Sequence, residues 1–323
     1  MEWPRGEARD CKSLYTGSNP VSTSIINFVT TLAIDIGATK IAVGLFDLQK
    51  NLLDRSEIRI LGSDDPWQLL ESKLSELSKL YKNEITKIGI ASAGPIDIVF
   101  GTISPVNIAV WRNFPILERI KSFFPKTIPV LIGDAIALTY AEYKIGAGKN
   151  LQNFLGMVVS TGIGGGLVLN GKLHQGRSGN AGYFGHHVVG ENKFTCACGR
   201  TGCVESFSSG PSMVRYANQK GWQGSNFEEL ANSADPIALE AITYGAKYLA
   251  KAIINVATVV DLTDAIVGGG VTESGEIFWN PFVNAISDEA RNVQFAENFR
   301  VHKAALKRDA GLIGAAFAAD GLE

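Results

Sequence analysis

The strongest constraint on the fold is a unit that occurs twice, in which a buried strand enters a glycine-rich turn and a second strand leaves it. The first copy begins at Thr31 and reads TLAIDIGATKIAVGLFD, and the second begins at Asn153 and reads NFLGMVVSTGIGGGLVLNGKLHQG. After each copy the hydrophobic pattern changes to helices alternating with further strands. This order predicts two α/β halves built on one plan, which bind ligands between them at the carboxyl ends of the strands.

Two helices stand out by their apolar spacing. In the first half Asp65 is the expected N-cap and Pro66 the first helical residue, and apolar side chains then recur every three or four positions. In the second half a longer helix is expected over residues 235–260. The apolar positions of the two helices are Trp67, Leu70, Leu74, Leu77 and Tyr81, and Leu239, Ile242, Ala246, Leu249, Ile253 and Val256.

These patterns also set the expected domain boundaries. We assign residues 31–146 to the first half and 147–323 to the second, with the final helix as a candidate to pack back on the first half. Residues 1–30 have no helical or strand period and lack the apolar core of a secretory signal. We expect that segment to be disordered or an artefact of the assigned start codon, and it contains Cys11.

Composition excludes several classes of protein. The net charge is −2 and the Lys and Arg residues are scattered, which argues against a nucleic-acid-binding protein. No apolar run reaches the roughly 18 residues that a membrane span needs, so no membrane association is expected. Four cysteines among 323 residues indicate a reducing compartment, and we therefore expect a cytoplasmic protein.

Three glycine turns follow buried strands, at residues 35–40, 160–166 and 268–270. Glycine lets the backbone approach an anion closely and turn its N–H groups toward it. For any one of these turns alone, a tight hairpin that needs a positive φ is the favoured explanation. Three of them together favour binding of nucleotide phosphates, although none fits the Walker pattern or G-x-G-x-x-G.

The stretch FTCACGRTGCVE contains three of the four cysteines, Cys196, Cys198 and Cys203. Cysteines two positions apart are too constrained to pair comfortably, and three thiols cannot all pair with one another. With His186, ten positions before Cys196, they would form a tetrahedral zinc set. His187 is an alternative ligand in a less suitable register, and three inert buried thiols are the alternative to a metal site.

Five segments together resemble the ROK family of bacterial sugar kinases and related repressors. They are LAIDIGATKIAVGLFD, STGIGGGLVLNGKLHQG, CACGRTGCVE, IVGGGV and RDAGLIGAA, in the same order from about Thr31 to Ala318. The resemblance implies an actin-like, hexokinase-like (ribonuclease H-like) duplicated α/β fold of two lobes with a sugar in the cleft between them. Among the members of this family, the sequence is most similar to the N-acetylmannosamine kinases. The resemblance implies ATP, Mg²⁺ and a structural Zn²⁺ as cofactors.

The resemblance also implies roles for individual residues. Asp134 would be the general base that accepts the proton of the sugar's 6-hydroxyl, whereas from the residues alone it is equally well a plain helix N-cap. Asp35 would lie beside the magnesium and the phosphates. The other implied sugar contacts are Gly94, Asn107, Tyr183, His186 and Glu205; the implied nucleotide contacts are Gly37, Thr39, Lys40, Thr161, Gly162, Gly164, Gly269 and Gly270; the implied zinc ligands are His186, Cys196, Cys198 and Cys203.

Two positions depart from the family's usual pattern. Gly133 stands where the family has Asn, and Tyr183 stands where it has Glu. These changes weaken sugar binding or select a different sugar. The alternatives are therefore a glucokinase or N-acetylglucosamine kinase, and a catalytically impaired sugar-binding regulator. A DNA-binding repressor is disfavoured because the first 30 residues show no helix-turn-helix pattern, and we expect a homodimer or homotetramer.

Overall fold

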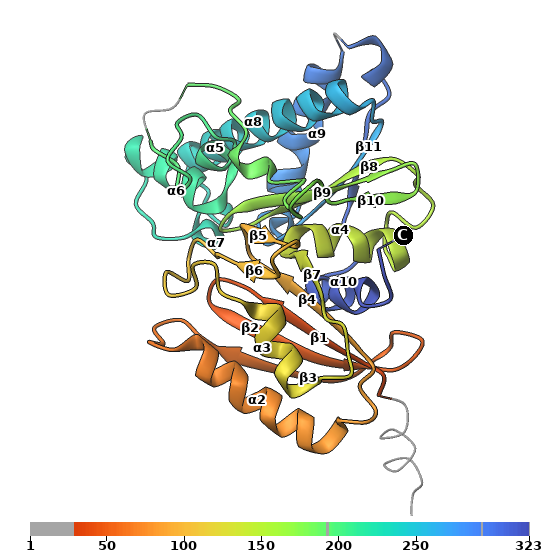
Figure 1. Cartoon of the computed structure of the whole chain (residues 1–323). Helices are drawn as coiled ribbons and strands as arrows, with labels where there is room; N and C mark the ends of the chain where they lie inside the picture. The colour runs from red at the N-terminus through yellow and green to blue at the C-terminus, as the bar shows by residue number, and fades with distance from the viewer. Residues whose placement is uncertain (1–28, 192–193, 292, 323) are drawn as a thin grey trace, which may run out of the picture.

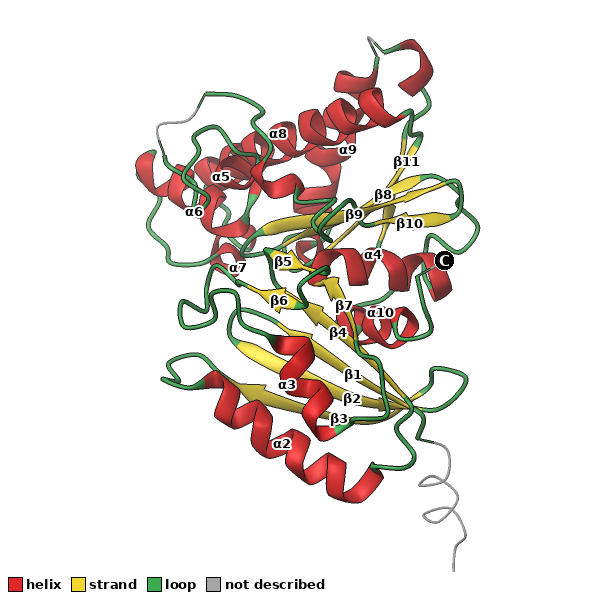
Figure 2. Ribbon diagram, viewed as in Figure 1, coloured by secondary structure: helices red, strands yellow, loops and turns green. Residues whose placement is uncertain are grey.

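Figure 1 shows the computed structural model of the chain, which describes residues 29–191, 194–291 and 293–322. The expected tail falls outside the described residues up to residue 28, and Cys11 with it. Two mixed sheets lie one above the other, and two helices, α4 (Asp134–Ile145) and α10 (Ala310–Ala318), lie between them (Figures 1 and 2).

The sheet of the first half has the strand order β3-β2-β1-β4-β7. β1 pairs antiparallel with β2 and parallel with β4. β2 pairs antiparallel with β3, and β4 pairs parallel with β7. The strands are β1 (Thr31–Ile36), β2 (Lys40–Phe46), β3 (Leu52–Arg59), β4 (Lys87–Ser92) and β7 (Val130–Gly133).

The sheet of the second half repeats this arrangement as β10-β9-β8-β11-β12. Its first three strands are again antiparallel to one another, and its last two are added in parallel. The strands are β8 (Phe154–Val159), β9 (Ile163–Leu169), β10 (Lys172–His174), β11 (Asp264–Gly268) and β12 (Arg300–Lys303). The duplicated α/β plan expected from the sequence is therefore confirmed.

Both faces of the first sheet are covered by helices. α2 (Pro66–Tyr81) begins as predicted: the Asp65 carboxylate accepts hydrogen bonds from the N–H groups of Trp67 and Gln68. α2 and α3 (Ile116–Phe123) pack on the outer face (Figure 2). Because side chains alternate along a strand, Asp35 shares the inner face of β1 with Ala33, which packs in the core formed with α4 and α10.

The two inner helices approach the sheets and each other closely. A Cβ added to Gly89 of β4 would collide with the carbonyl group of Ala315, and one added to Gly314 would collide with the carbonyl group of Ala137. At these points the backbone of α10 is in direct contact with the backbones of β4 and α4, with no side chain between them. The last helix of the chain therefore packs within the first half, although its sequence follows the second sheet.

Helices also cover the outer face of the second sheet. They are α5 (Glu205–Ser208), α6 (Gly210–Gln219), α7 (Phe227–Ala231), α8 (Pro236–Val260) and α9 (Glu276–Ala290), and the remaining short elements are β5 (Ile96–Asp97), β6 (Thr102–Ile103) and the 3₁₀ turns η1 (Phe184–His186), η2 (Thr272–Ser274) and η3 (Gln294–Ala296). α8 spans the predicted range, but Leu239 is 49% exposed because Ala238 and Ala241 face the core instead. None of the helices in the described ranges combines the length and apolarity that a bilayer crossing requires.

Candidate functional site

A cavity of about 570 Å³ lies between the two halves, and both contribute to its walls. It brings together side chains that are far apart in the sequence and come from separate motifs. The predicted site residues that line it are Gly94, Asn107, Asp134, Thr161, Gly162, Gly164, Tyr183, His186 and Glu205. We refer to it as the first cavity.

Asp134 lies in this cavity where β7 ends and α4 begins. Gly133 is the N-cap of α4 and Asp134 its first residue, and Oδ1 of Asp134 accepts a hydrogen bond of 2.7 Å from the N–H of Ala135. Burial raises the pKa of the Asp134 carboxyl above its ordinary value. The alternative interpretation of the sequence, in which Asp134 is the N-cap of this helix, is therefore wrong by one residue.

Asp35 lies close to Asp134, at the carboxyl end of β1. Burial, and after it the charge of Asp134, raise the pKa of Asp35 to about 7. Its carboxylate abuts the start of α10, since a Cβ added to Gly311 would collide with Oδ2 of Asp35. Two acidic groups therefore meet at the ends of β1 and β7, and carboxylate oxygens are the ligands that Mg²⁺ prefers.

A second cavity of about 830 Å³ adjoins the first. Ser160 and Thr161, in the turn between β8 and β9, line both cavities. Gly270 also lines the second cavity. Gly269 supports it from behind: its φ is 101°, and a Cβ there would collide with the backbone of Val159. The turn at residues 160–161 therefore lies at the boundary between the first and the second cavity.

The turn between β1 and β2 contributes little to these walls. Ala38 lines the first cavity, whereas Gly37, Thr39 and Lys40 line neither. The N–H of Gly37 donates to the Lys40 carbonyl oxygen at 3.0 Å, and Lys40 Nζ lies 3.2 Å from Glu57 Oε2. The turn is therefore a closed hairpin, and its contact with the cavity is through Ala38.

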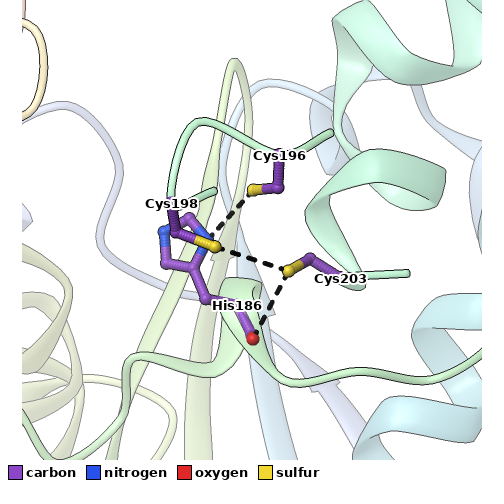
Figure 3. A group of neighbouring side chains, drawn as sticks. All are labelled: His186, Cys196, Cys198 and Cys203. Atoms are coloured by element: carbon purple, nitrogen blue, oxygen red, sulfur yellow. Dashed lines mark hydrogen bonds between the residues drawn. The ribbon is translucent and has the colours of Figure 1, made fainter. Parts of the chain in front are cut away.

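The three cysteines and His186 form one cluster at the edge of the first cavity (Figure 3). Their four donor atoms lie within 4.8 Å of one another; Cys198 Sγ is 3.6 Å from Cys203 Sγ, and His186 Nδ1 is 3.2 Å from Cys196 Sγ. A tetrahedral Zn²⁺ separates its ligand atoms by about 3.5–3.8 Å, so this donor set fits zinc. His187 Nδ1 instead lies 3.2 Å from the Phe184 carbonyl oxygen.

Glu205 connects this cluster to the turn between the cavities. Its Oε2 accepts a 2.9 Å hydrogen bond from the N–H of Ile163, and its Oε1 lies 3.9 Å from Cys196 Sγ. A Cβ added to Gly162 would lie 2.9 Å from Oε2. The Glu205 side chain therefore contacts both the turn, at Gly162 and Ile163, and the cysteine cluster, at Cys196.

Tyr183 forms an apolar part of the wall. The residue is 40% exposed, and its ring centroid lies 4.5 Å from that of His186. Tyr183 Cε2 is 3.1 Å from the position of a Cβ on Gly94, whose carbonyl oxygen accepts a hydrogen bond from the N–H of Val106. The cavity wall therefore includes a partly apolar surface, formed by Gly94, Val106 and Tyr183.

Several lining residues were not predicted. Asn180 and Val106 belong to the first cavity, and Asn226 and Phe227 belong to the second. Asn226 caps α7 by accepting from the N–H of Glu229, a signal that the sequence SNFEE carries. No local signal, however, indicates that α7 lies beside the glycine turns.

The arrangement matches a known protein family over nearly the whole described chain. The model of the ROK family matches residues 31–321. The chain belongs to the ROK family. The resemblance stated from the sequence is therefore confirmed, and so is the actin-like, hexokinase-like fold that it implied.

Individual family members are similar over almost their full length. An N-acetylmannosamine kinase of Escherichia coli O127:H6 is 34% identical, over 91% of this chain and 99% of its own. The crystal structure of a ROK hexokinase from Thermus thermophilus has a TM-score of 0.79 and 30% identity, covering 90% of this chain and 97% of its own. A ROK glucokinase from Streptomyces griseus, solved with glucose and AMPPNP, has a TM-score of 0.76 and 28% identity, covering 90% and 99%.

Proposed function

We propose that the protein is an ATP-dependent sugar kinase that phosphorylates the 6-hydroxyl of a hexose or N-acylhexosamine held in the first cavity. The observation that carries this proposal is the turn at Ser160 and Thr161, which lines both cavities. A phosphoryl group on this turn would be within reach of ligands on both sides. The related Streptomyces griseus glucokinase was solved with a sugar and an ATP analogue bound, which supports the same pairing of ligands here.

Asp134 is the residue suited to accept the proton of the attacking hydroxyl. It lines the sugar side of the site, and its hydrogen bond to Ala135 uses Oδ1. Its raised pKa makes it a better proton acceptor than an exposed aspartate, provided that it is ionised. Because phosphoryl transfer depends on positioning and charge neutralisation, one oriented carboxylate beside the hydroxyl is sufficient.

The second cavity suits the adenosine part of ATP. Phe227 and Pro211 offer apolar surface for a base, while Asn226 and Glu228 offer polar groups. Asp35 is the residue that would hold Mg²⁺ with the phosphates, and the ion would neutralise part of their charge when bound. Asp35 by itself offers a carboxylate at the carboxyl end of β1, against the positive end of the α10 dipole.

The cysteine cluster is best suited to a structural zinc ion. Three thiolates and one imidazole fill a tetrahedral shell and leave no position for a reacting water. Two residues that line the sugar side are tied to the cluster: His186 belongs to it, and Glu205 lies 3.9 Å from Cys196 Sγ. Holding the cluster rigid would therefore hold these two sugar-facing groups at fixed positions.

The wall formed by Gly94, Val106 and Tyr183 favours an N-acylhexosamine, and N-acetylmannosamine in particular. An N-acetyl group carries a methyl that gains from contact with apolar surface, which a free hydroxyl does not. The N-acetylmannosamine kinases among the relatives support this choice. Glucose and N-acetylglucosamine are the alternatives, since the similar structures include a glucokinase.

The test is a coupled assay of ADP release with glucose, mannose, fructose, N-acetylglucosamine and N-acetylmannosamine, for the wild type and for Asp134→Asn. We expect turnover with at least one sugar and a loss of about 10²–10⁴-fold in kcat in the variant, with sugar binding by calorimetry retained. Turnover in the variant at the wild-type rate would contradict the role of Asp134. Sugar binding by the wild type without any turnover would instead identify a regulator that has lost catalysis.

A further inference from the structure

Asn180 joins the two halves of the molecule at the edge of the first cavity. It lies in the second half, between β10 and η1, and its side chain is half-buried. Its Oδ1 accepts a hydrogen bond of 3.0 Å from the N–H of Ile96, and its Nδ2 donates one of 2.7 Å to the carbonyl oxygen of the same residue. The amide thus pairs with β5 of the first half much as a neighbouring strand would.

The residues before Asn180 strengthen this junction. The N–H of Ile98 donates to the carbonyl oxygen of Ser178 at 3.2 Å. Gly179 is buried with a φ of 88°, and a Cβ there would lie 2.6 Å from Cγ2 of Ile98 and 3.0 Å from Cδ1 of Ile96. No side chain fits between Gly179 and the side chains of Ile96 and Ile98, so only glycine is tolerated at position 179.

The residues after Asn180 fasten the same segment to the second sheet. The N–H of Gly165 in β9 donates to the carbonyl oxygen of Gly182 at 3.0 Å, and a Cβ on Gly182 would collide with the carbonyl of Gly165. The segment that contains Asn180 is therefore hydrogen-bonded to β9 of its own half, while the side-chain amide of Asn180 is hydrogen-bonded to β5 of the other half.

The chain itself crosses between the halves elsewhere, near Glu142 of α4. Glu142 is fully buried, and its two carboxylate oxygens accept hydrogen bonds from the N–H groups of Ala147, at 2.7 Å, and Leu306, at 2.6 Å. These residues belong to the two crossing segments. Gly179, the residue before Asn180, lies at the other end of α4, with its carbonyl oxygen 3.7 Å from the position of a Cβ on Gly133. The residues from Asp134 to Glu142 span about 12 Å of helix. A rotation hinged at Glu142 would therefore open the molecule at Asn180.

We propose that Asn180 is a positioning residue for sugar binding: it clamps β5 and Gly94 of the first half against Tyr183 of the second, so that the sugar-facing wall is assembled before ATP binds. This inference rests on the proposed function. The geometry that supports it is local, since the position of a Cβ on Gly94 lies 3.1 Å from Tyr183 Cε2 and 3.7 Å from Asn180 Oδ1. The nucleotide side is spared, because none of the second cavity's walls comes from this segment.

Two variants and a matched control test the clamp by steady-state kinetics. Asn180→Ala removes both bonds to Ile96, and we expect the KM for the sugar to rise about tenfold or more while the KM for ATP stays within about twofold. Asn180→Asp is isosteric and retains the acceptor, but it places a carboxylate oxygen against the Ile96 carbonyl oxygen, so a rise at least as large as that in Asn180→Ala is expected. Asn153→Ala removes a similar side-chain bond, that of Asn153 Oδ1 to the N–H of Asn170, far from β5, and should change neither KM.

Amide hydrogen exchange at Ile96 and Ile98 gives a second readout that needs no catalysis. Exchange at both amides should rise at least about tenfold in Asn180→Ala relative to Asn153→Ala, because both amides donate across the junction. An unchanged sugar KM in Asn180→Ala, or an equal rise in both KM values, would overturn the positioning role. If the wild type phosphorylates no sugar, the proposed function fails. The clamp is then judged by amide exchange alone: unchanged exchange at Ile96 and Ile98 in Asn180→Ala would refute it, and raised exchange would support it.

Discussion

Asp35 is expected to destabilise the protein at neutral and alkaline pH when no ligand is bound. Its carboxyl is buried beside Asp134, and its pKa is raised to about 7 from an ordinary value of 3.8. A group whose folded-state pKa is raised binds its proton more tightly in the folded state than in the unfolded chain. Its stabilising contribution is therefore complete below about pH 4 and is lost as the pH rises to about 7.

The magnitude follows from these two values. At about pH 5 the carboxyl is protonated in the folded state and ionised in the unfolded one, and at about pH 8 it is ionised in both. The two pH units between about 5 and 7 correspond to about 3 kcal/mol of folding free energy. Asp35→Asn cannot ionise, so the variant should gain about 2–3 kcal/mol relative to the wild type on going from pH 5 to pH 8.

The assay is urea denaturation of wild type and Asp35→Asn at both pH values, with no Mg²⁺ or nucleotide added. Comparing the change with pH, rather than the stabilities themselves, cancels the pH-independent effect of replacing an oxygen by an NH₂ group. Asp54→Asn, on the exposed side of β3, is the matched control and should show no such change. If Asp35→Asn gains no stability between the two pH values, the carboxyl is not held in the buried, acidic setting described here.

Two further predictions concern the metal cluster and the core. The purified protein should contain about one zinc per chain by elemental analysis, and Cys198→Ser should lose it with a fall in Tm, whereas full occupancy in that variant would exclude Cys198 as a ligand. Leu74→Ala should cost about 2–5 kcal/mol in urea denaturation because Leu74 is fully buried in α2, while Leu239→Ala should cost under about 0.5 kcal/mol because Leu239 is half-exposed; equal costs would contradict the orientation of α8.

Where a local signal was strong, the sequence predicted the structure well. Asp65 and Pro66 define the start of α2 because capping depends only on neighbouring residues. The repeated strand–turn–strand unit predicted both sheets, since alternation and glycine turns are also local. The cysteine spacing predicted a cluster that the fold brings together, with His186 as its fourth member.

Where the outcome depends on distant contacts, the sequence was less informative. α9 was not predicted because Pro281 lies inside it and interrupts the helical pattern. The contact of Asp35 with Gly311 and the bonds of Asn180 to Ile96 join residues far apart in the chain, and nothing in their own neighbourhoods indicates them. The nucleotide contact of Gly37 was implied by the family resemblance and stays a prediction; in the fold the N–H of Gly37 donates to the Lys40 carbonyl oxygen of its own turn.

The most direct test of the central claim, transfer of phosphate across the turn at Ser160 and Thr161, is identification of the products by ³¹P NMR. The protein is incubated with ATP, Mg²⁺ and N-acetylmannosamine or glucose. We predict one sugar 6-phosphate for each ADP formed by the wild type, and sugar phosphate formed at least about 10²-fold more slowly with Asp134→Asn. Release of ADP with inorganic phosphate alone, or the same sugar phosphate from the variant at an undiminished rate, would contradict the account.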